Sequence, residues 1–347
     1  MSITMIGLDT AKSVFQVHAV DAAGNAVIRR KIQRKDLITF FEKQEKCTVV
    51  MEACGAAHHW GRTLTGLGHD VKLIAPEAVK PYVKKGKKND AADAAAICAA
   101  AVRPDVKFVP IKTVEQQAIL ALHAARSLLE KQKTALANSI RGLATEFGLT
   151  VPKGVENIEG LVVEVQADES LPVELRQAVK EAHEQFLEAN GHIEKLEKKI
   201  VHHARTDDTA RRLATIPGIG PITASLIAAS VVDISAFKSA RHFAAWLGLV
   251  PRQHSTAGKT RLGRITKAGN SEIRRMLVLG ATSMIRHAGQ WNSAAGAWFR
   301  SILERCPARL ATVALANKNA RIAWALMTRN EIYRPSGNGA AAAKAAA

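Results

Sequence analysis

The sequence predicts an α/β N-terminal domain, a helical middle segment and a mainly α C-terminal domain. Short apolar runs of strand length crowd the first 75 residues, leucines recur every seven residues between 115 and 147, and apolar stretches of helical length mark the last third. With 347 residues, 47% of them hydrophobic, the chain is long enough to bury a core in more than one domain.

The N-terminal third begins with three strands, and turn residues separate the second from the third. Helices and strands then alternate. We expect strands at 3–9, 14–20, 26–32, 47–53 and 70–74, and helices at 34–46 and 58–68. Three antiparallel-type strands followed by this alternation is the element order of an RNase H-like fold.

Four carboxylates in this region form a candidate metal centre. Asp9 ends the first expected strand and Glu52 ends the fourth, while Asp90 and Asp93 are three residues apart and share one helix face. Such a set can hold two divalent ions about 4 Å apart, and magnesium suits oxygen ligands. Asp90 alone could be a helix N-cap. A charge at the end of an interior strand, as at Asp9, is costly unless paired or metal-bound, which favours the metal centre.

The charge balance indicates a polyanionic partner. Forty-nine Lys and Arg against thirty-one Asp and Glu give a formal net charge of +18, so nucleic acid is the leading candidate.

We expect no membrane contact and a cytoplasmic, nucleoid-associated protein, because the sequence has no run of eighteen apolar residues and its start lacks the features of a signal peptide. Four lysines before Asp90 either lie in a solvated loop or bind the phosphates of a nucleic acid: Lys84, Lys85, Lys87 and Lys88.

The middle of the chain predicts two long helices that pair antiparallel. Leu122, Leu129, Leu136 and Leu143 recur at heptad spacing, and a second periodic stretch covers 186–200. This coiled-coil pattern favours dimerisation or an arm that spans nucleic acid, and the alternative is a helical hairpin that only links two domains.

A tight turn between apolar helices predicts a helix-hairpin-helix element over 213–229. In such an element, Gly218 and Gly220 would let backbone N–H groups bind a phosphate. The alternative is a helical turn used only for packing.

A second C-terminal signal is a glycine-rich loop that contains Ser255 and Thr256. Nearby cations would favour a serine alkoxide and stabilise a phosphorane, although hydrogen bonding or capping is the commoner role of a loop serine. We assign no catalytic role to His254. The surrounding cations, which we expect to bind nucleic acid, are Arg252, Lys259, Arg261, Arg264, Lys267, Arg274 and Arg275.

Read together, "IGLDTAKSVFQV", "VVMEACGAAHHW", "KKNDAADAAAI", "IPGIGPITAS" and "GLVPRQHSTAGKTRLGRITKAGN" resemble the DEDD-type insertion-sequence transposases. The resemblance implies a RuvC-like N-terminal domain, a serine-bearing C-terminal transposase domain and RNA-guided recombination, in which a structured non-coding RNA pairs with donor and target DNA. It also implies a covalent serine–DNA linkage. The residues it matches to the metal-binding acids and the catalytic serine are Asp9, Glu52, Asp90, Asp93 and Ser255.

This chain departs from many relatives in two places. It carries Asn89-Asp90 where they have Thr-Asp, and Ser255-Thr256 where they have two serines. The first change keeps the carboxylate. The second leaves Thr256 as the less favoured alternative nucleophile.

We therefore expect a RuvC-like domain at 1–112, a helical arm at 113–206, a serine transposase domain at 207–333 and a disordered tail at 334–347. The expected function is to cut and rejoin element-end and target DNA with about two magnesium ions and Ser255, as a homodimer or tetramer guided by RNA. The first alternative is a metal-dependent RuvC-like junction nuclease, in which the acids activate water and Ser255 is dispensable. The second is a non-catalytic nucleic-acid-binding protein in which the acids are structural caps.

Overall fold

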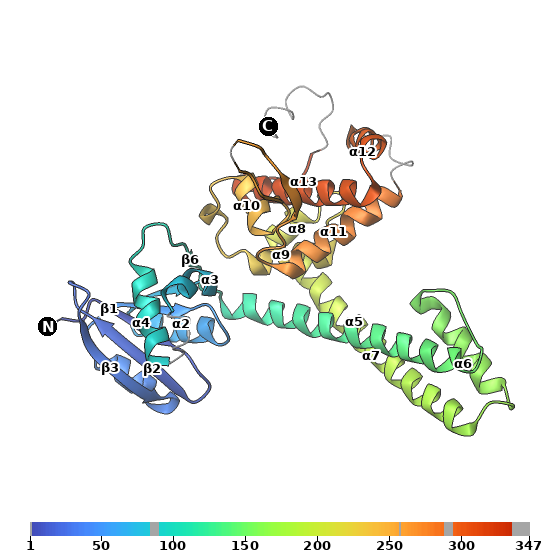
Figure 1. Ribbon diagram of the computed structural model, residues 1–347, viewed down its shortest axis with the longest axis horizontal. Coiled ribbons are helices and arrows are strands. Elements are labelled where there is room, and N and C mark those ends of the chain that lie inside the picture. Colours follow the sequence, from blue (N-terminus) through green and yellow to red (C-terminus); the bar gives the residue numbers. More distant parts are fainter. Residues whose placement is uncertain (1, 84–89, 257, 288–293, 335–347) are drawn as a thin grey trace. The chain divides into compact units, whose positions relative to one another are not determined.

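A computed structural model of the chain describes residues 2–83, 90–256, 258–287 and 294–334, without the side chains of residues 90, 294–296 and 299. The chain forms two compact units, Met1–Glu115 and Gln116–Ala347 (Figure 1). Each unit is described separately below. The four-part division expected from the sequence stays a prediction.

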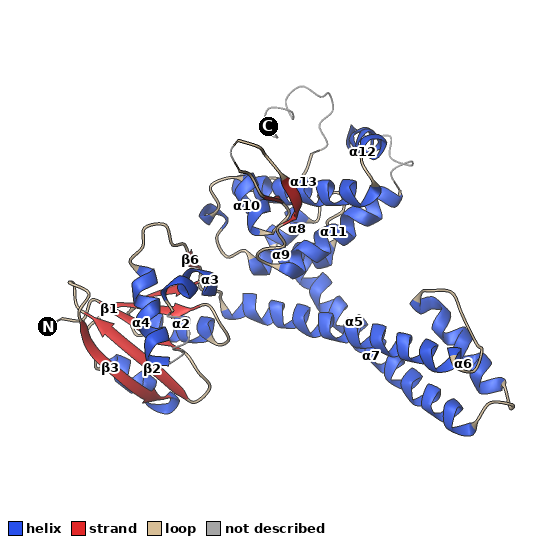
Figure 2. Cartoon of the chain, in the orientation of Figure 1, coloured by secondary structure: helices blue, strands red, loops and turns tan. Residues whose placement is uncertain are grey.

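The first unit is built on a six-stranded mixed sheet with the strand order β3-β2-β1-β4-β5-β6 (Figure 2). β1, β2 and β3 pair antiparallel, β1, β4 and β5 pair parallel, and β6 is antiparallel to β5. The five strands expected from the sequence are confirmed, and β6 is additional. The strands are β1 (Met5–Asp9), β2 (Val14–Val20), β3 (Ala26–Gln33), β4 (Thr48–Glu52), β5 (Asp70–Ile74) and β6 (Phe108–Val109).

Helices cover both faces of this sheet because its strands alternate buried side chains between the two faces. Ile6 and Leu8 of β1 face Phe41 and Trp60 on one side. On the other side, Val50 and Ile74 pack with residues of α4. Figure 1 shows α4 lying across this sheet. The helices of this unit are η1 (Arg34–Asp36), α1 (Leu37–Glu42), α2 (Ala57–Gly66), α3 (Pro76–Val79), η2 (Lys80–Tyr82) and α4 (Asp90–Ala101).

Gly7 lets α4 lie directly against β1. A Cβ atom at this position would come within 2.7 Å of Cys98 Sγ and would also collide with the carbonyl oxygen of Ala94. The Cys98 thiol donates to the carbonyl oxygen of His18 on β2 at 3.4 Å. The middle of α4 is therefore held against the centre of the sheet.

The second unit begins with an arm in which two long helices pair antiparallel, as the sequence predicts. Arg126 Nε donates to Glu197 Oε1 at 2.7 Å, and Lys133 Nζ donates to Asn190 Oδ1 at 3.0 Å. The heptad leucines are half-buried, whereas their neighbours Ala137, Ile140 and Ala144 on the same helix are fully buried. The helices of the arm are α5 (Val114–Thr145), η3 (Val155–Asn157), α6 (Ile158–Ala167) and α7 (Val173–Thr206).

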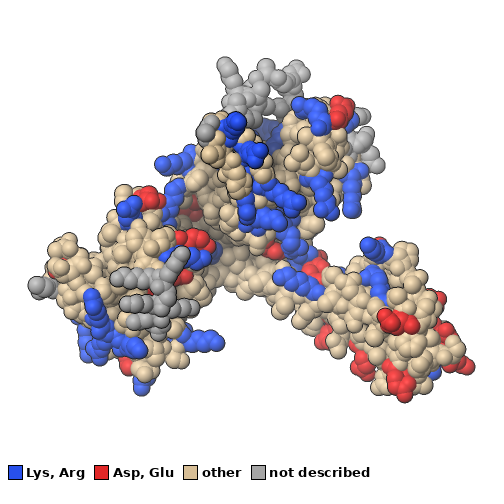
Figure 3. Space-filling model, in the orientation of Figure 1, with Lys and Arg blue, Asp and Glu red and all other residues tan. Residues whose placement is uncertain are grey.

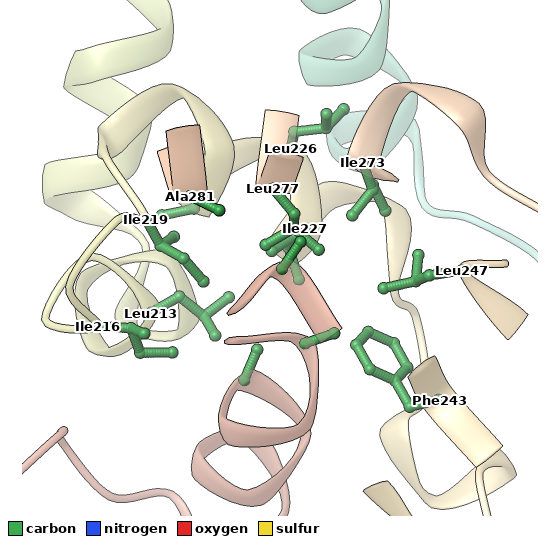
Figure 4. Packing of buried hydrophobic residues seen from close by; sticks show 14 of the residues in the cluster. Leu213, Ile216, Ile219, Leu226, Ile227, Phe243, Leu247, Ile273, Leu277 and Ala281 are labelled. Carbon is green, nitrogen blue, oxygen red and sulfur yellow. The ribbon is translucent and has the colours of Figure 1, made fainter. Parts of the chain in front are cut away.

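The rest of the second unit is mainly helical around one apolar core, to which Leu213, Ile227, Phe243 and Leu277 belong (Figure 4). A two-stranded sheet, which the sequence did not predict, is added to the helices. No helix among the described residues is long and apolar enough to cross a membrane. The elements are α8 (Asp208–Leu213), α9 (Pro221–Ser230), η4 (Ile234–Ala236), α10 (Ala240–Trp246), β7 (Pro251–Gln253), β8 (Leu262–Ile265), α11 (Ser271–Arg286), α12 (Ala294–Arg305) and α13 (Ala308–Arg329).

Candidate functional site

Asp9 and Glu52 end neighbouring strands at the same register. β1 and β4 pair parallel with Gly7 opposite Val50 and Leu8 opposite Met51, so Asp9 and Glu52 follow as the next pair. Neighbouring strands lie about 4.8 Å apart, and in-register side chains point to the same face. Gly7 and Val50 both face α4, so the two carboxylates lie on the α4 side of the sheet.

Asp93 brings a third carboxylate to this face. Asp93 directly precedes Ala94, and the carbonyl oxygen of Ala94 lies against Gly7. Gly7 is two residues before Asp9 on β1. Burial raises the pKa of Glu52, and the negative charges of Asp93 and then Glu77 raise it further, while Lys80 lowers it. A bound cation would offset the effect of these negative charges on Glu52.

The donor chemistry of this cluster suits a hard cation such as magnesium, because its side chains offer carboxylate oxygens. Within the described part of the chain, no three His, Cys, Asp or Glu side chains lie close enough to hold a metal ion. The Asp90 side chain, the expected fourth ligand, is outside the description, and α4 begins at that residue. Lys84, Lys85, Lys87 and Lys88 also lie outside the described residues.

Two residues near the acids were missed in the sequence. Glu77 on α3 acts electrostatically on Glu52. Cys54 contacts Thr10, with 3.1 Å between the thiol sulfur and the hydroxyl oxygen, and so links the segments that follow β1 and β4. Neither could be found from periodicity, because both lie just outside the strands.

Ser255 lies near the tip of a β-hairpin rather than in an irregular loop. The hairpin extends beyond β7 and β8 because His254 N donates to Arg261 O at 2.8 Å, and Thr256 and Lys259 form a further bridge. Gly258 in the turn has φ +78°, a conformation that favours glycine. Asn317 anchors the base of the hairpin, because its Nδ2 donates to the carbonyl oxygen of Leu249 at 3.2 Å.

Ser255 is exposed, and its hydroxyl contacts Gln253, the last residue of β7. Gln253 Nε2 donates to Ser255 Oγ at 2.9 Å. Residues two apart in an extended segment share a face, which explains the contact. A donor at Oγ stabilises negative charge on that oxygen, and it leaves the hydroxyl hydrogen free to be given away.

The cations expected around Ser255 divide into two groups. Arg274 is half-buried and donates to the carbonyl oxygens of Leu247 and Ala268, so it braces the base of the hairpin. Arg275 is paired with Glu272. The remaining cations are exposed and have no carboxylate partner among the described residues: Arg252, Lys259, Arg261, Arg264 and Lys267.

The two glycines of the turn before α9 have different surroundings: Gly218 is packed against other residues, and Gly220 is exposed. Gly218 has φ +85°, and a Cβ there would collide with Met284 Sδ. The carbonyl oxygen of Pro217 accepts from Asn319 Nδ2 at 2.9 Å. Gly220, at the N-cap of α9, is exposed and faces open space. Of the two expected phosphate-binding glycines, Gly218 is therefore half-buried and packed against Met284, whereas Gly220 is exposed.

The strand β3 carries a basic group of residues that the sequence interpretation did not single out. β3 is an edge strand, and Lys and Arg side chains gather over it (Figure 3). Arg34 lies over the ring of Trp60, with 5.2 Å from its guanidinium carbon to the ring centroid. The exposed cations of this edge are Arg29, Arg30, Lys31, Arg34 and Lys35.

A buried polar network joins the arm to the core of the second unit. Ser225 Oγ on α9 lies 3.0 Å from both His123 Nε2 on α5 and His203 Nδ1 on α7. Burial lowers the pKa of His123 to about 4, and Arg126 and His203 contribute to the shift, while Glu272 opposes it. His123 is therefore neutral near pH 7.

Comparison with known proteins places this chain among transposases. Residues 6–148 match the family model described as transposase of the DEDD type, and residues 210–295 match the transposase IS116/IS110/IS902 family. A Sinorhizobium fredii protein that carries a transposase name is 50% identical over 96% of this chain and 86% of its own length. The transposase for insertion sequence element IS1111A of Coxiella burnetii is 40% identical over 96% of this chain and 92% of its own length. The transposase for insertion sequence element IS1328 of Yersinia enterocolitica is 38% identical over 96% of this chain and 99% of its own length.

The class of protein is thus a transposase with a mixed α/β N-terminal sheet and a mostly helical remainder. The chain belongs to the IS116/IS110/IS902 transposase family. This confirms the resemblance drawn from its motifs.

Proposed function

We propose that this chain cuts and rejoins the DNA of an insertion sequence, using a RuvC-like metal centre and a serine nucleophile. The observation that carries the proposal is the in-register pair Asp9 and Glu52, on the sheet face against which Gly7 seats α4. Burial and the negative charge of Asp93 disfavour ionised Glu52, and a bound cation would offset this cost, which supports a metal-binding role.

Magnesium would be held by Asp9, Glu52, Asp90 and Asp93. When bound, it stabilises negative charge on the oxygens of the reacting phosphate. The chain's own contribution would be to hold Asp9 and Glu52 on the sheet face that α4 covers, and the sheet register and the close contact of α4 with Gly7 support this.

Ser255 would supply the attacking oxygen. Its Oγ forms a bond to phosphorus while one phosphorus–oxygen ester bond of the DNA breaks, the hydroxyl proton passes to solvent, and the departing DNA oxygen takes up a proton. Attack on the serine ester by a DNA hydroxyl then reverses these bond changes, rejoins the strand and frees Ser255. Gln253 assists because its amide donates to Oγ. The exposed Arg252, Lys259 and Arg261 would bind the phosphate backbone.

Two further surfaces would bind nucleic acid. The exposed N-cap at Gly220 would bind a backbone phosphate as part of a helix-hairpin-helix element. The cations of β3 would hold additional backbone. Together with the net charge of +18, this basic surface supports a structured guide RNA as a second partner beside DNA.

The arm would join copies of the chain through a coiled coil. The half-buried Leu129 and Leu136 line a groove of about 640 Å³ between α5 and α7, together with Ala189 of α7. Carboxylates gather at the α6 end of the arm (Figure 3), which disfavours nucleic acid as the partner there. The exposed acids at this end are Glu156, Glu159, Glu164, Glu169 and Glu174.

One assay tests the serine chemistry against the alternatives. Full-length protein is incubated with magnesium, the element's non-coding RNA and labelled element-end DNA, and a protein–DNA adduct that survives denaturation is sought. We expect the adduct with wild type and none with Ser255→Ala or Asp9→Asn. If wild type cleaves the DNA without forming an adduct, and Ser255→Ala still cleaves it, the protein is instead a metal-dependent nuclease. Binding with no cleavage in any variant would identify a non-catalytic binding protein.

A further inference from the structure

Gln16 lies in the same row of side chains as the two strand-end acids. β2 pairs antiparallel with β1, and Gln16 stands directly opposite Asp9. Opposed residues of an antiparallel pair point to the same face of the sheet. The row across three neighbouring strands is therefore Gln16, Asp9 and Glu52, all on the face that α4 covers.

The side chain of Gln16 is buried at this position with an unsatisfied oxygen. Gln16 is 6% exposed, and its Oε1 has no hydrogen-bond partner in the described part of the structure. Buried polar atoms without a partner are rare in folded proteins, and each calls for an explanation. A neighbouring carboxylate such as Asp9 cannot satisfy Oε1, because both groups accept hydrogen bonds.

We propose that Gln16 Oε1 is a further oxygen donor of the metal centre, facing the bound ion or a water molecule that the ion carries. Amide oxygens are ordinary ligands of hard cations, and magnesium usually keeps several of its waters. A neutral donor adds no further negative charge to a face that already carries Asp9 and Glu52. This inference rests on the proposed metal centre and adds to it a neutral donor beside the four carboxylates.

The competing arrangement is a rotated amide whose Nε2 donates to the Asp9 carboxylate. The two arrangements predict opposite effects of Gln16→Glu. If Oε1 faces the ion, glutamate keeps the oxygen and adds charge, so metal binding is maintained or strengthened. If Nε2 holds Asp9, glutamate replaces a donor with a second carboxylate, and metal binding weakens.

The test measures Mn²⁺ binding to the full chain by electron paramagnetic resonance of the free ion, without nucleic acid. We expect Gln16→Met, which keeps the length but removes the amide, to weaken binding about 10- to 100-fold. Gln16→Glu should bind at least as tightly as wild type. The matched control is Gln33→Met, an exposed glutamine on β3, which should stay within about twofold of wild type. Circular dichroism checks folding, and Gln16→Leu, which also removes the amide, replaces Gln16→Met with the same expected loss of binding if the latter does not fold.

The inference is overturned if Gln16→Met binds Mn²⁺ like wild type, or if Gln16→Glu is as weak as Gln16→Met. Asp9→Asn separates this failure from a failure of the metal centre. When Asp9→Asn loses binding and Gln16→Met keeps it, only the role of Gln16 is wrong. When wild type does not bind Mn²⁺, or Asp9→Asn binds it normally, the metal centre and the role of Gln16 both fall.

Discussion

Asp9 and Glu52 end two neighbouring parallel strands at the same register, on the sheet face covered by α4. The backbone therefore brings together two carboxylates that are 43 positions apart in the sequence. Burial and the negative charges of Asp93 and Glu77 disfavour the ionised form of Glu52, and a bound cation would favour it. Predictions about this pair test both the fold and the proposed chemistry.

Replacing Gly7 by Ala should displace α4 and with it Asp93. The new methyl group would meet Cys98 Sγ and the Ala94 carbonyl oxygen, so we expect a loss of about 1–3 kcal/mol in the free energy of unfolding. Chemical denaturation measures the loss, and Mn²⁺ titration measures the accompanying loss of metal affinity. The control is Gly66→Ala, where a Cβ would meet nothing within 4 Å. Equal behaviour of the two variants would contradict the close seat of α4.

Replacing Glu52 by Gln should stabilise the metal-free protein at neutral pH. The pKa of Glu52 is raised in the folded state from its ordinary value of 4.5. Folding thus favours the protonated form, and this contribution is complete below pH 4.5 and is lost as pH rises through the raised pKa. The variant should match wild type at low pH and melt about 1–3 °C higher at pH 7.

Magnesium should make wild type melt at a higher temperature than Glu52→Gln at pH 7, which reverses their order in the metal-free protein. The ion stabilises ionised Glu52, so wild type should gain stability on addition of magnesium and Glu52→Gln should gain much less. Thermal melts with and without the ion check this. A wild-type melting temperature that does not respond to magnesium would contradict the role of Glu52.

The neutral state of His123 should make the second unit sensitive to acid. Because folding lowers the pKa of His123 from 6.5 to about 4, its contribution is complete above pH 6.5 and is lost as pH falls towards 4. The loss amounts to at most about 3 kcal/mol. His123→Gln should flatten the pH dependence of unfolding in this window, whereas His287→Gln, at an exposed histidine, should not. Identical slopes for the two variants would contradict the assignment.

The basic edge strand should contribute to nucleic-acid affinity. Replacing Arg29, Arg30 and Lys31 with Gln should reduce the slope of log affinity against log salt by about 3, since each phosphate contact contributes about 0.9. Fluorescence anisotropy with element-end DNA measures the slope. Matched replacement of three exposed lysines on α7 should leave it almost unchanged: Lys195, Lys198 and Lys199. Equal effects would indicate that only net charge matters.

The sequence predicted the first five strands well because their apolar residues follow a period of two, and it predicted the strand-end acids because each strand ends where its apolar run ends. It did not predict β7 and β8. These strands are three and four residues long, each carries one exposed arginine, and they form no apolar pattern. Their pairing depends on how Asn317 and Arg274 anchor the hairpin base, and these contacts are distant in sequence.

Tertiary packing also decided which predicted site residues are accessible. Arg274 and Arg275 were grouped with their basic neighbours, yet one binds backbone carbonyl oxygens and the other pairs with Glu272. Gly218 is packed against Met284, while Gly220 is exposed. Gln16 was not predicted to be a site residue, because in the sequence it is one polar residue of an alternating strand. Its burial beside Asp9 follows from the position of α4, which no local pattern encodes.

The most direct test of the central claim identifies the residue that becomes linked to DNA. The adduct formed with magnesium, RNA and element-end DNA is digested with nuclease and trypsin, and the modified peptide is sequenced by mass spectrometry. Cleavage after Arg252 and Lys259 yields a peptide that contains both Ser255 and Thr256. Our account predicts the nucleotide on Ser255, and an adduct that persists in Thr256→Val. A nucleotide on Thr256 or on another peptide would contradict it.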